Sequence, residues 1–121
     1  MPKILIVDDE KDILAVLQEA FTNFGYVAEI AETAKEGIHK FDNDLFDLVI
    51  TDMLMPDMNG DGVVRHIRRS YRPFTPVIGC SGTPWLLEDI DFDRVLTKPF
   101  RLKEILSAVE SLSAKFQRNN G

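Results

Sequence analysis

Short, largely apolar runs alternate with helically spaced apolar positions along the chain. The runs at Ile4–Val7, Leu48–Ile50, Pro76–Cys80 and Arg94–Thr97 are typical of strands, and Tyr26–Ala31 is a weaker, alternating one. The stretches between them repeat apolar residues every three or four positions, which predicts helices. This alternation is typical of βαβ units around a parallel sheet.

The first two predicted helices have recognisable ends. Apolar positions from Ile13 to Phe24 predict a helix that stops at Gly25. Thr33 and Glu36 have the spacing of a capping box, which predicts the start of the second helix. The inward positions of that second helix are Ala34, Ile38 and Phe41.

The remaining helices differ in length. The third begins near Val63, and Thr83 with Pro84 favours the start of a fourth helix that is short or irregular. The last begins near Leu102, and its apolar stripe is Ile105, Leu106, Val109, Leu112 and Phe116. Right-handed crossovers would place these helices on both faces of a five-stranded parallel sheet.

The composition fits one folded domain. With 121 residues, of which 45% are hydrophobic and 28% charged, the chain can build a core. Its longest aliphatic run, Ile4–Val7, is far below the ~18 residues that indicate a membrane span, and the acids directly after it argue against a signal peptide. One cysteine, Cys80, excludes an internal disulfide. We therefore expect a cytoplasmic protein with a single domain over residues 1–121 and no output domain in this chain.

The charge is acidic and unevenly distributed. The chain has 20 Asp and Glu against 14 Lys and Arg, a net charge of −6, which argues against a general nucleic-acid binder. Residues 1–60 hold 13 acids and 4 bases, a net of −9, and residues 61–121 hold 7 acids and 10 bases, a net of +3. Because acids interrupt well-patterned elements, some of them are candidates for a site.

Chemically complementary residues follow the four most apolar strand runs. These residues are Asp8 with Asp9, Asp52, Ser81 and Lys98. The carboxyl ends of parallel strands share one edge of the sheet, where ligands of α/β proteins bind. Taken singly, each residue has an ordinary structural explanation as a helix cap, a turn former or a solvated charge. Their combination predicts one pocket with three carboxylates, a hydroxyl and an ammonium group.

This donor set favours phosphoryl chemistry. Three clustered carboxylates repel one another unless a cation lies among them, and oxygen ligands without Cys or His favour Mg²⁺. A carboxylate can also act as a nucleophile and form an aspartyl phosphate. Asp52, between the acidic pair and Lys98, suits the acceptor role. Lys98 would contact the phosphoryl oxygens, and Ser81 would donate a hydrogen bond to one of them.

The motifs resemble the response-regulator receiver family of two-component signalling. The resemblance rests on Ile6–Glu10, on Leu48–Gly60 with its D-x-x-M-P-x-x-x-G pattern, on Pro76–Ser81 and on Lys98–Phe100, and it covers roughly residues 2–116. It implies a flavodoxin-like, doubly wound (βα)5 fold with three layers and strand order 2-1-3-4-5.

The resemblance also implies roles for the acidic residues. Asp52 would receive a phosphoryl group from the phosphohistidine of a sensor histidine kinase or phosphotransfer protein. Asp9 and Asp52, with the backbone carbonyl of Leu54, would coordinate Mg²⁺, and Asp8 would act mainly through a bound water.

The rest of the implied site is the switch. Ser81 would be the hydroxyl that moves toward the phosphate, Lys98 would contact it, and the Lys98–Pro99 bond is expected to be cis. The chain would then be a phosphoacceptor that assists its own phosphorylation and dephosphorylation, and not an enzyme. We expect phosphorylation to change the partner-binding surface, and we expect no direct contact with nucleic acid or membrane. The sequence does not name the downstream effector, and it leaves weak homodimerisation open.

Departures from the family pattern concern the switch and its output. Val95 stands where members usually carry an aromatic residue or histidine, so coupling through a ring is not expected. The segment between Ser81 and Lys98 is short. We expect Trp85 and Leu86 to pack onto the sheet, and the alternative is an exposed binding patch.

Residues beside the phosphorylation site bear on the lifetime of the phosphoryl group. Gly82, where members more often carry alanine, favours a flexible loop. Leu54 and Thr83 offer no side chain that obviously orients an attacking water. We therefore expect a phosphoryl group of moderate to long lifetime.

Two functions compete with the switch. A phosphatase of the haloacid-dehalogenase type would use similar chemistry, but it usually carries a second aspartate two residues after the nucleophile, where this chain has Leu54. An unphosphorylated interaction module with a receiver fold is the other alternative. The five site residues argue against it, and Val95 with the short fourth helix keeps it open.

Other polar residues have structural explanations. Cys80 is expected to be a core residue, and His39 and His66 lack metal-ligand spacing. Four arginines on the third helix and just beyond it are expected to form a solvated face, with a docking patch for an acidic partner as the alternative: Arg65, Arg68, Arg69 and Arg72.

Overall fold

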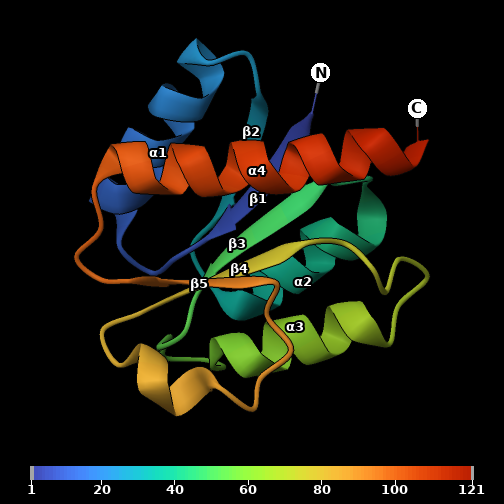
Figure 1. The fold of residues 1–121 in the computed structure, drawn as a ribbon. Coiled ribbons are helices and arrows are strands. Elements are labelled where there is room, and N and C mark those ends of the chain that lie inside the picture. The colour runs from blue at the N-terminus through green and yellow to red at the C-terminus, as the bar shows by residue number, and fades with distance from the viewer. Residues whose placement is uncertain (1, 121) are drawn as a thin grey trace.

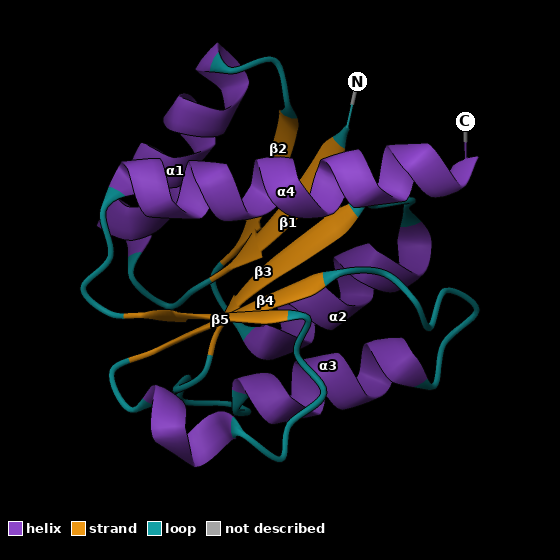
Figure 2. Cartoon of the chain, in the orientation of Figure 1, coloured by secondary structure: helices purple, strands orange, loops and turns teal. Residues whose placement is uncertain are grey.

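Five parallel strands form the centre of the protein (Figure 2). The structure is a computed structural model that describes the backbone of residues 2–120 and the side chains of residues 2–112. The strands lie in the order β2-β1-β3-β4-β5, as the resemblance implies. Their bounds are β1 Lys3–Val7, β2 Val27–Ala31, β3 Leu48–Asp52, β4 Val77–Ser81 and β5 Arg94–Thr97.

Helices cover both faces of this sheet, which confirms the three-layer prediction (Figure 1). Helices α1 and α4 lie on one face, and α2 and α3 lie on the other. The bounds are α1 Lys11–Asn23, α2 Ala34–Asn43, α3 Gly60–Arg68 and α4 Leu102–Asn120. Within residues 2–120, no helix is both long enough and apolar enough to cross a membrane.

The core has two halves because side chains alternate along each strand. In β1, Ile4 and Ile6 belong to the cluster that packs under α1 and α4, whereas Leu5 and Val7 belong to the cluster under α2 and α3. All four side chains are buried, and this explains why the strand is a continuous apolar run. On α4 the predicted stripe is confirmed at Ile105, Leu106, Val109 and Leu112, and the side chain of Phe116 lies outside the described residues.

The predicted helix ends are largely confirmed. Gly25 follows α1 with a φ of 90°, a conformation that favours glycine. Thr33 accepts a hydrogen bond from the Glu36 N–H at 3.0 Å. The Glu36 carboxylate binds the N–H of Glu32 at 3.0 Å, one residue earlier than a capping box requires. The start of α2 is therefore held by two hydrogen bonds, one to the Thr33 hydroxyl and one to the Glu36 carboxylate.

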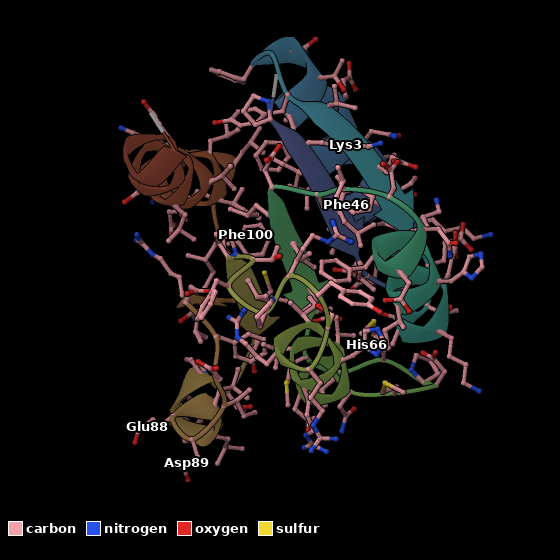
Figure 3. The ribbon with its side chains drawn as sticks, turned by 90° about the vertical axis from the view of Figure 1, so that its right-hand side faces the viewer. Lys3, Phe46, His66, Glu88, Asp89 and Phe100 are labelled. Atoms are coloured by element: carbon pink, nitrogen blue, oxygen red, sulfur yellow. The ribbon has the colours of Figure 1, made fainter. Side chains whose placement is uncertain are left out.

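Between β4 and β5 the chain forms a single 3₁₀ turn, η1, over Pro84–Leu87, which confirms the short fourth helix. The expectation that Trp85 and Leu86 pack onto the sheet is wrong, because they are 65% and 68% exposed. A 3₁₀ turn has three residues per turn, so Pro84 and Leu87 face the same way, and Leu87 is the buried residue. Figure 3 shows Glu88 and Asp89 projecting outward just after this turn.

The predicted arginine face is only partly correct. Arg68 forms ion pairs with Asp91 at 3.1 Å and Asp93 at 2.8 Å, and it therefore ties α3 to the segment before β5. The Arg72 guanidinium lies 4.4 Å from the centre of the Phe41 ring on α2. Both side chains are structural, which a helical projection does not reveal because their partners come from distant segments. The exposed members of the set are Arg65 and Arg69.

We expect Gly60→Ala to destabilise the fold. A Cβ atom at residue 60 would lie 2.6 Å from the backbone oxygen of Asp52, so the backbone would have to move. The free energy of unfolding, measured by urea denaturation, should fall by about 1–3 kcal/mol. Gly82→Ala is the control, because a Cβ there meets nothing within 4 Å. Equal stability of the two variants would contradict this prediction.

Candidate functional site

The predicted site residues meet at the carboxyl edge of the sheet. Asp8 follows β1, Asp52 and Ser81 end β3 and β4, and Lys98 follows β5. Asp52, Ser81 and Lys98 line a surface cavity of about 250 Å³, and Asp8 contacts Lys98 beside it. Its lining comprises Asp9, Glu10, Asp52, Met53, Leu54, Ser81, Gly82 and Lys98. The parallel topology thus brings together residues that are up to ninety positions apart, as predicted.

Lys98 is the cation at the centre of the cluster. Its Nζ lies 3.2 Å from Asp8 Oδ2 and 3.2 Å from Asp52 Oδ1. Glu10 Oε1 is 3.8 Å away. One ammonium group is therefore shared among three carboxylates. The Lys98–Pro99 bond is cis, as the resemblance implies.

Burial and charge shift the proton affinities of these groups. Burial raises the pKa of Asp52, the neighbouring Asp8 raises it further, and Lys98 opposes both effects. Burial lowers the pKa of Lys98, but Asp52 and Asp8 outweigh it, so the net pKa lies above the ordinary value. Lys98 therefore keeps its ammonium group at neutral pH, while the ionised form of the Asp52 carboxylate is destabilised.

The acidic residues of this cluster suit a hard cation. Asp8, Asp9 and Glu10 each offer a carboxylate oxygen, and these three atoms lie within 4.8 Å of one another. Carboxylate oxygens are the ligands that Mg²⁺ prefers. Asp52 lines the same cavity, so the donor chemistry of the site fits Mg²⁺.

Glu10 is the acidic residue that the sequence analysis missed. Asp8 Oδ1 accepts a hydrogen bond from the Glu10 N–H at 2.9 Å, a short turn that brings Glu10 back toward the pocket. The signal that could have revealed this was an aspartate two residues before another acid at a strand end. The ligand roles expected of Asp9, Asp52 and the Leu54 carbonyl stay predictions.

Ser81 is engaged by its own loop. Its Oγ accepts a hydrogen bond from the Thr83 N–H at 3.0 Å and lies 3.3 Å from Thr83 Oγ1. Ser81 is buried, and Thr83 directly precedes η1. A movement of this hydroxyl away from Thr83 would therefore break a contact at the start of that turn.

Two other polar residues lie outside the lining of the acidic cavity, and the expected core position of Cys80 is confirmed. Cys80 is buried in β4, and burial raises the pKa of its thiol to about 12, so it carries no thiolate at neutral pH. His66, labelled in Figure 3, pairs with Asp42 of α2 at 2.7 Å, and both residues lie outside the cavity lining.

An apolar groove adjoins the site. It has a volume of about 560 Å³, and Glu10 and Lys98 line both this groove and the acidic cavity. The rest of its lining is Asp12, Ile13, Val16, Leu17, Pro99, Phe100 and Leu102. The groove is not evident from the sequence, because its walls come from α1 and from the loop before α4. An exposed valine, Val16, on an otherwise polar helix face was the available signal.

We expect Asp52→Asn to stabilise the metal-free protein. A folded-state pKa above the ordinary value means that this group favours folding at low pH and that the contribution is lost as pH rises through the folded pKa. At pH 7 without divalent cations, the variant should melt a few degrees higher, because about 1 kcal/mol shifts the Tm of such a domain by roughly 4 °C. The difference should vanish below the ordinary Asp pKa of about 4. The exposed Asp89→Asn is the control, and a lower Tm for Asp52→Asn at pH 7 would contradict the argument.

Curated proteins similar to this chain are regulators. The transcriptional regulatory protein CusR of Escherichia coli is 31% identical over 114 residues, covering 91% of this chain and 50% of CusR. The probable transcriptional regulator ycf27 of Cyanidium caldarium is 30% identical over 122 residues, covering 97% of this chain and 48% of that protein. The chain thus spans about half the length of the curated relatives it matches.

Solved structures and a family model agree with these relatives. A CheY-like receiver domain protein from Methanospirillum hungatei is 30% identical with a TM-score of 0.88, covering 100% of this chain and 99% of that one. The response regulator TrrA of Thermotoga maritima, in complex with Mg²⁺-BeF, is 31% identical with a TM-score of 0.84, covering 93% of this chain and 99% of that one. The family model of the response regulator receiver domain matches residues 4–110. This chain therefore belongs to the response regulator receiver domain family.

Proposed function

We propose that this chain is a cytoplasmic, phosphorylation-dependent switch of a two-component system. Asp52 accepts a phosphoryl group from the phosphohistidine of a sensor histidine kinase or phosphotransfer protein, in a reaction that depends on Mg²⁺. The single observation that carries the proposal is the position of Lys98 Nζ, 3.2 Å from both Asp8 and Asp52 at an open cavity. Lys98 thus places positive charge where a transferred phosphoryl group needs it.

The chemistry follows from the residues around Asp52. One carboxylate oxygen attacks phosphorus, the P–N bond of the phosphohistidine breaks, and the imidazole leaves with the electron pair of that bond. Lys98 contacts the phosphoryl oxygens, and Ser81 donates its hydroxyl proton to one of them in a hydrogen bond. Asp9, Asp52 and the Leu54 carbonyl would hold Mg²⁺, with Asp8 acting through a bound water, and the ion would supply charge neutralisation.

The change of state follows from the added charge. A phosphoryl group brings about −1.5 to −2 charge and three acceptor oxygens. Ser81 Oγ accepts from the Thr83 N–H at 3.0 Å, so a shift of this hydroxyl toward the phosphoryl oxygens would pull on the residue at the start of η1. Val95 offers no aromatic ring to move, so the signal passes through this loop to the surface that partners bind.

The apolar groove is the proposed docking surface of the phosphodonor. It adjoins the acidic cavity at Glu10 and Lys98, so a partner seated there would lie beside the phosphoacceptor. Half-buried Phe100 and exposed Val16 supply apolar area for a transient contact. A donor protein with an apolar helix face would fit it.

The alternatives are less well supported. A haloacid-dehalogenase phosphatase needs a second carboxylate two residues after its nucleophile, and Leu54, 69% exposed, stands there. A passive interaction module needs no cation between two buried aspartates. The contacts of Lys98 with Asp8 and Asp52 therefore favour the switch.

We expect acetyl phosphate and Mg²⁺ to add the mass of one phosphoryl group to the intact protein. Asp52→Ala should show no gain, EDTA should abolish it, and Lys98→Ala should slow it about 100-fold or more, as for the loss of one preorganised donor. Asp42→Ala, at an exposed acid outside the cavity lining, should react normally. Turnover of phosphomonoesters would favour the phosphatase instead. A mass unchanged by acetyl phosphate and by a cognate kinase would favour the passive module.

We also expect the phosphoryl group to persist for minutes or longer after the donor is removed. Leu54 places an apolar side chain beside the site and cannot orient water. Leu54→Asn should shorten the half-life several-fold in a mass time course, whereas Leu45→Asn, at another exposed leucine, should leave it unchanged. A half-life of seconds for the unmodified protein would refute the expectation.

A further inference from the structure

The loop between β3 and α3 carries the residues that directly follow the phosphoacceptor. At its base, the Gly60 N–H donates to the Met53 carbonyl at 2.8 Å, and the Met53 N–H donates to the Cys80 carbonyl at 3.0 Å. Met55 is buried in the core under α2 and α3. Leu54 lies between these anchors and lines the acidic cavity.

The far side of this loop is fastened to a different helix. Asp57 Oδ1 accepts a hydrogen bond from the Ala34 N–H at 3.1 Å, and Oδ2 accepts one from the Lys35 N–H at 2.9 Å. Burial raises the pKa of Asp57, but the N–H donors of Lys35 and Ala34 outweigh it and hold the pKa below the ordinary value. The carboxylate therefore stays ionised and binds the positive end of α2.

Helix α2 in turn packs against β1, the strand that Asp8 and Asp9 directly follow. A Cβ atom at Gly37 would lie 2.7 Å from Val7 Cγ2, so the helix backbone directly contacts the residue before Asp8. The chain thus forms a bridge from the segment of Asp8 and Asp9, through α2 and Asp57, to the segment of Asp52 and Leu54. Both segments contribute to the proposed metal site.

We propose that Asp57 is a positioning residue that holds the Leu54 segment in register with the acidic pair and so strengthens divalent-cation binding. This inference rests on the proposed function, because it concerns the same metal site. A flexible loop must lose conformational freedom when it supplies a carbonyl ligand. A loop already clamped at both sides loses less, so binding is tighter.

The helix itself offers a matched control. Thr33 caps the same first turn of α2 by accepting from the Glu36 N–H, but among the described residues it makes no hydrogen bond to the β3–α3 loop. Thr33→Ala and Asp57→Ala should therefore destabilise α2 to a similar degree, each lowering Tm by a few degrees. Only Asp57→Ala releases the loop.

The test is calorimetric titration of Mg²⁺ into each purified protein, below the Tm of the least stable variant. We expect the Kd to rise at least fivefold in Asp57→Ala, to rise less in Asp57→Asn, which keeps one acceptor oxygen, and to stay within twofold of wild type in Thr33→Ala. Hydrogen exchange should show faster exchange of the Ala34 and Lys35 amides in Asp57→Ala. Both measurements are independent of phosphorylation.

Each contrary result has a distinct meaning. An unchanged Kd in both Asp57 variants would overturn the inference and leave the proposed function intact. An equal loss of affinity in Thr33→Ala and Asp57→Ala would overturn it too, since helix stability alone would then explain the effect. Wild-type protein without detectable Mg²⁺ binding would overturn both the inference and the metal site on which it rests.

Discussion

One ammonium group shared between two buried aspartates is the constraint on which the rest of the structure depends. Lys98 lies 3.2 Å from Asp8 and 3.2 Å from Asp52, although these residues come from three different strand ends. Only a parallel sheet with β1, β3, β4 and β5 side by side brings them to one edge. Two aspartates that have lost most of their water are costly, so the fold depends on an apolar sheet covered on both faces to hold them there. The stability of the covered sheet therefore holds the charge cluster together at its carboxyl edge.

This cluster remains incompletely neutralised in the free protein. Asp52 keeps a raised pKa even beside Lys98, because burial and Asp8 together outweigh the ammonium group. A fold selected only for stability would avoid such a group, and sites that do chemistry commonly depart from that optimum. In the proposed function, this unbalanced negative charge is the property that would attract a divalent cation. In the proposed reaction, that cation and Lys98 then meet the further negative charge of the phosphoryl group.

Much of the site could be predicted because it follows from sheet topology and from residues at strand ends. Asp8, Asp52, Ser81 and Lys98 each follow or end an apolar run, so parallel pairing alone places them together. The misjudged arginines have a different cause, which is that their side-chain partners lie far away in sequence. Arg68 is tied to Asp91 and Asp93, and Arg72 covers an aromatic ring of α2, which a single-helix projection cannot show. Trp85 is exposed because the segment forms a 3₁₀ turn and not an α-helix. A segment of four residues is too short for the spacing of its apolar residues to distinguish the two.

The absence of a ring at position 95 changes how a switch in this chain would have to work. Where no aromatic side chain can swing inward, movement of Ser81 must be transmitted by the backbone that holds it. The Thr83 N–H is that connection: it donates to Ser81 at 3.0 Å, while the Thr83 carbonyl accepts from Leu86 at 3.0 Å within η1. A single 3₁₀ turn has few internal hydrogen bonds, so losing its first contact is a larger fraction of its stability than it would be for a full helix. In such a switch, a short fourth helix and the absence of a ring would be compatible features, because the short turn would make an aromatic ring dispensable.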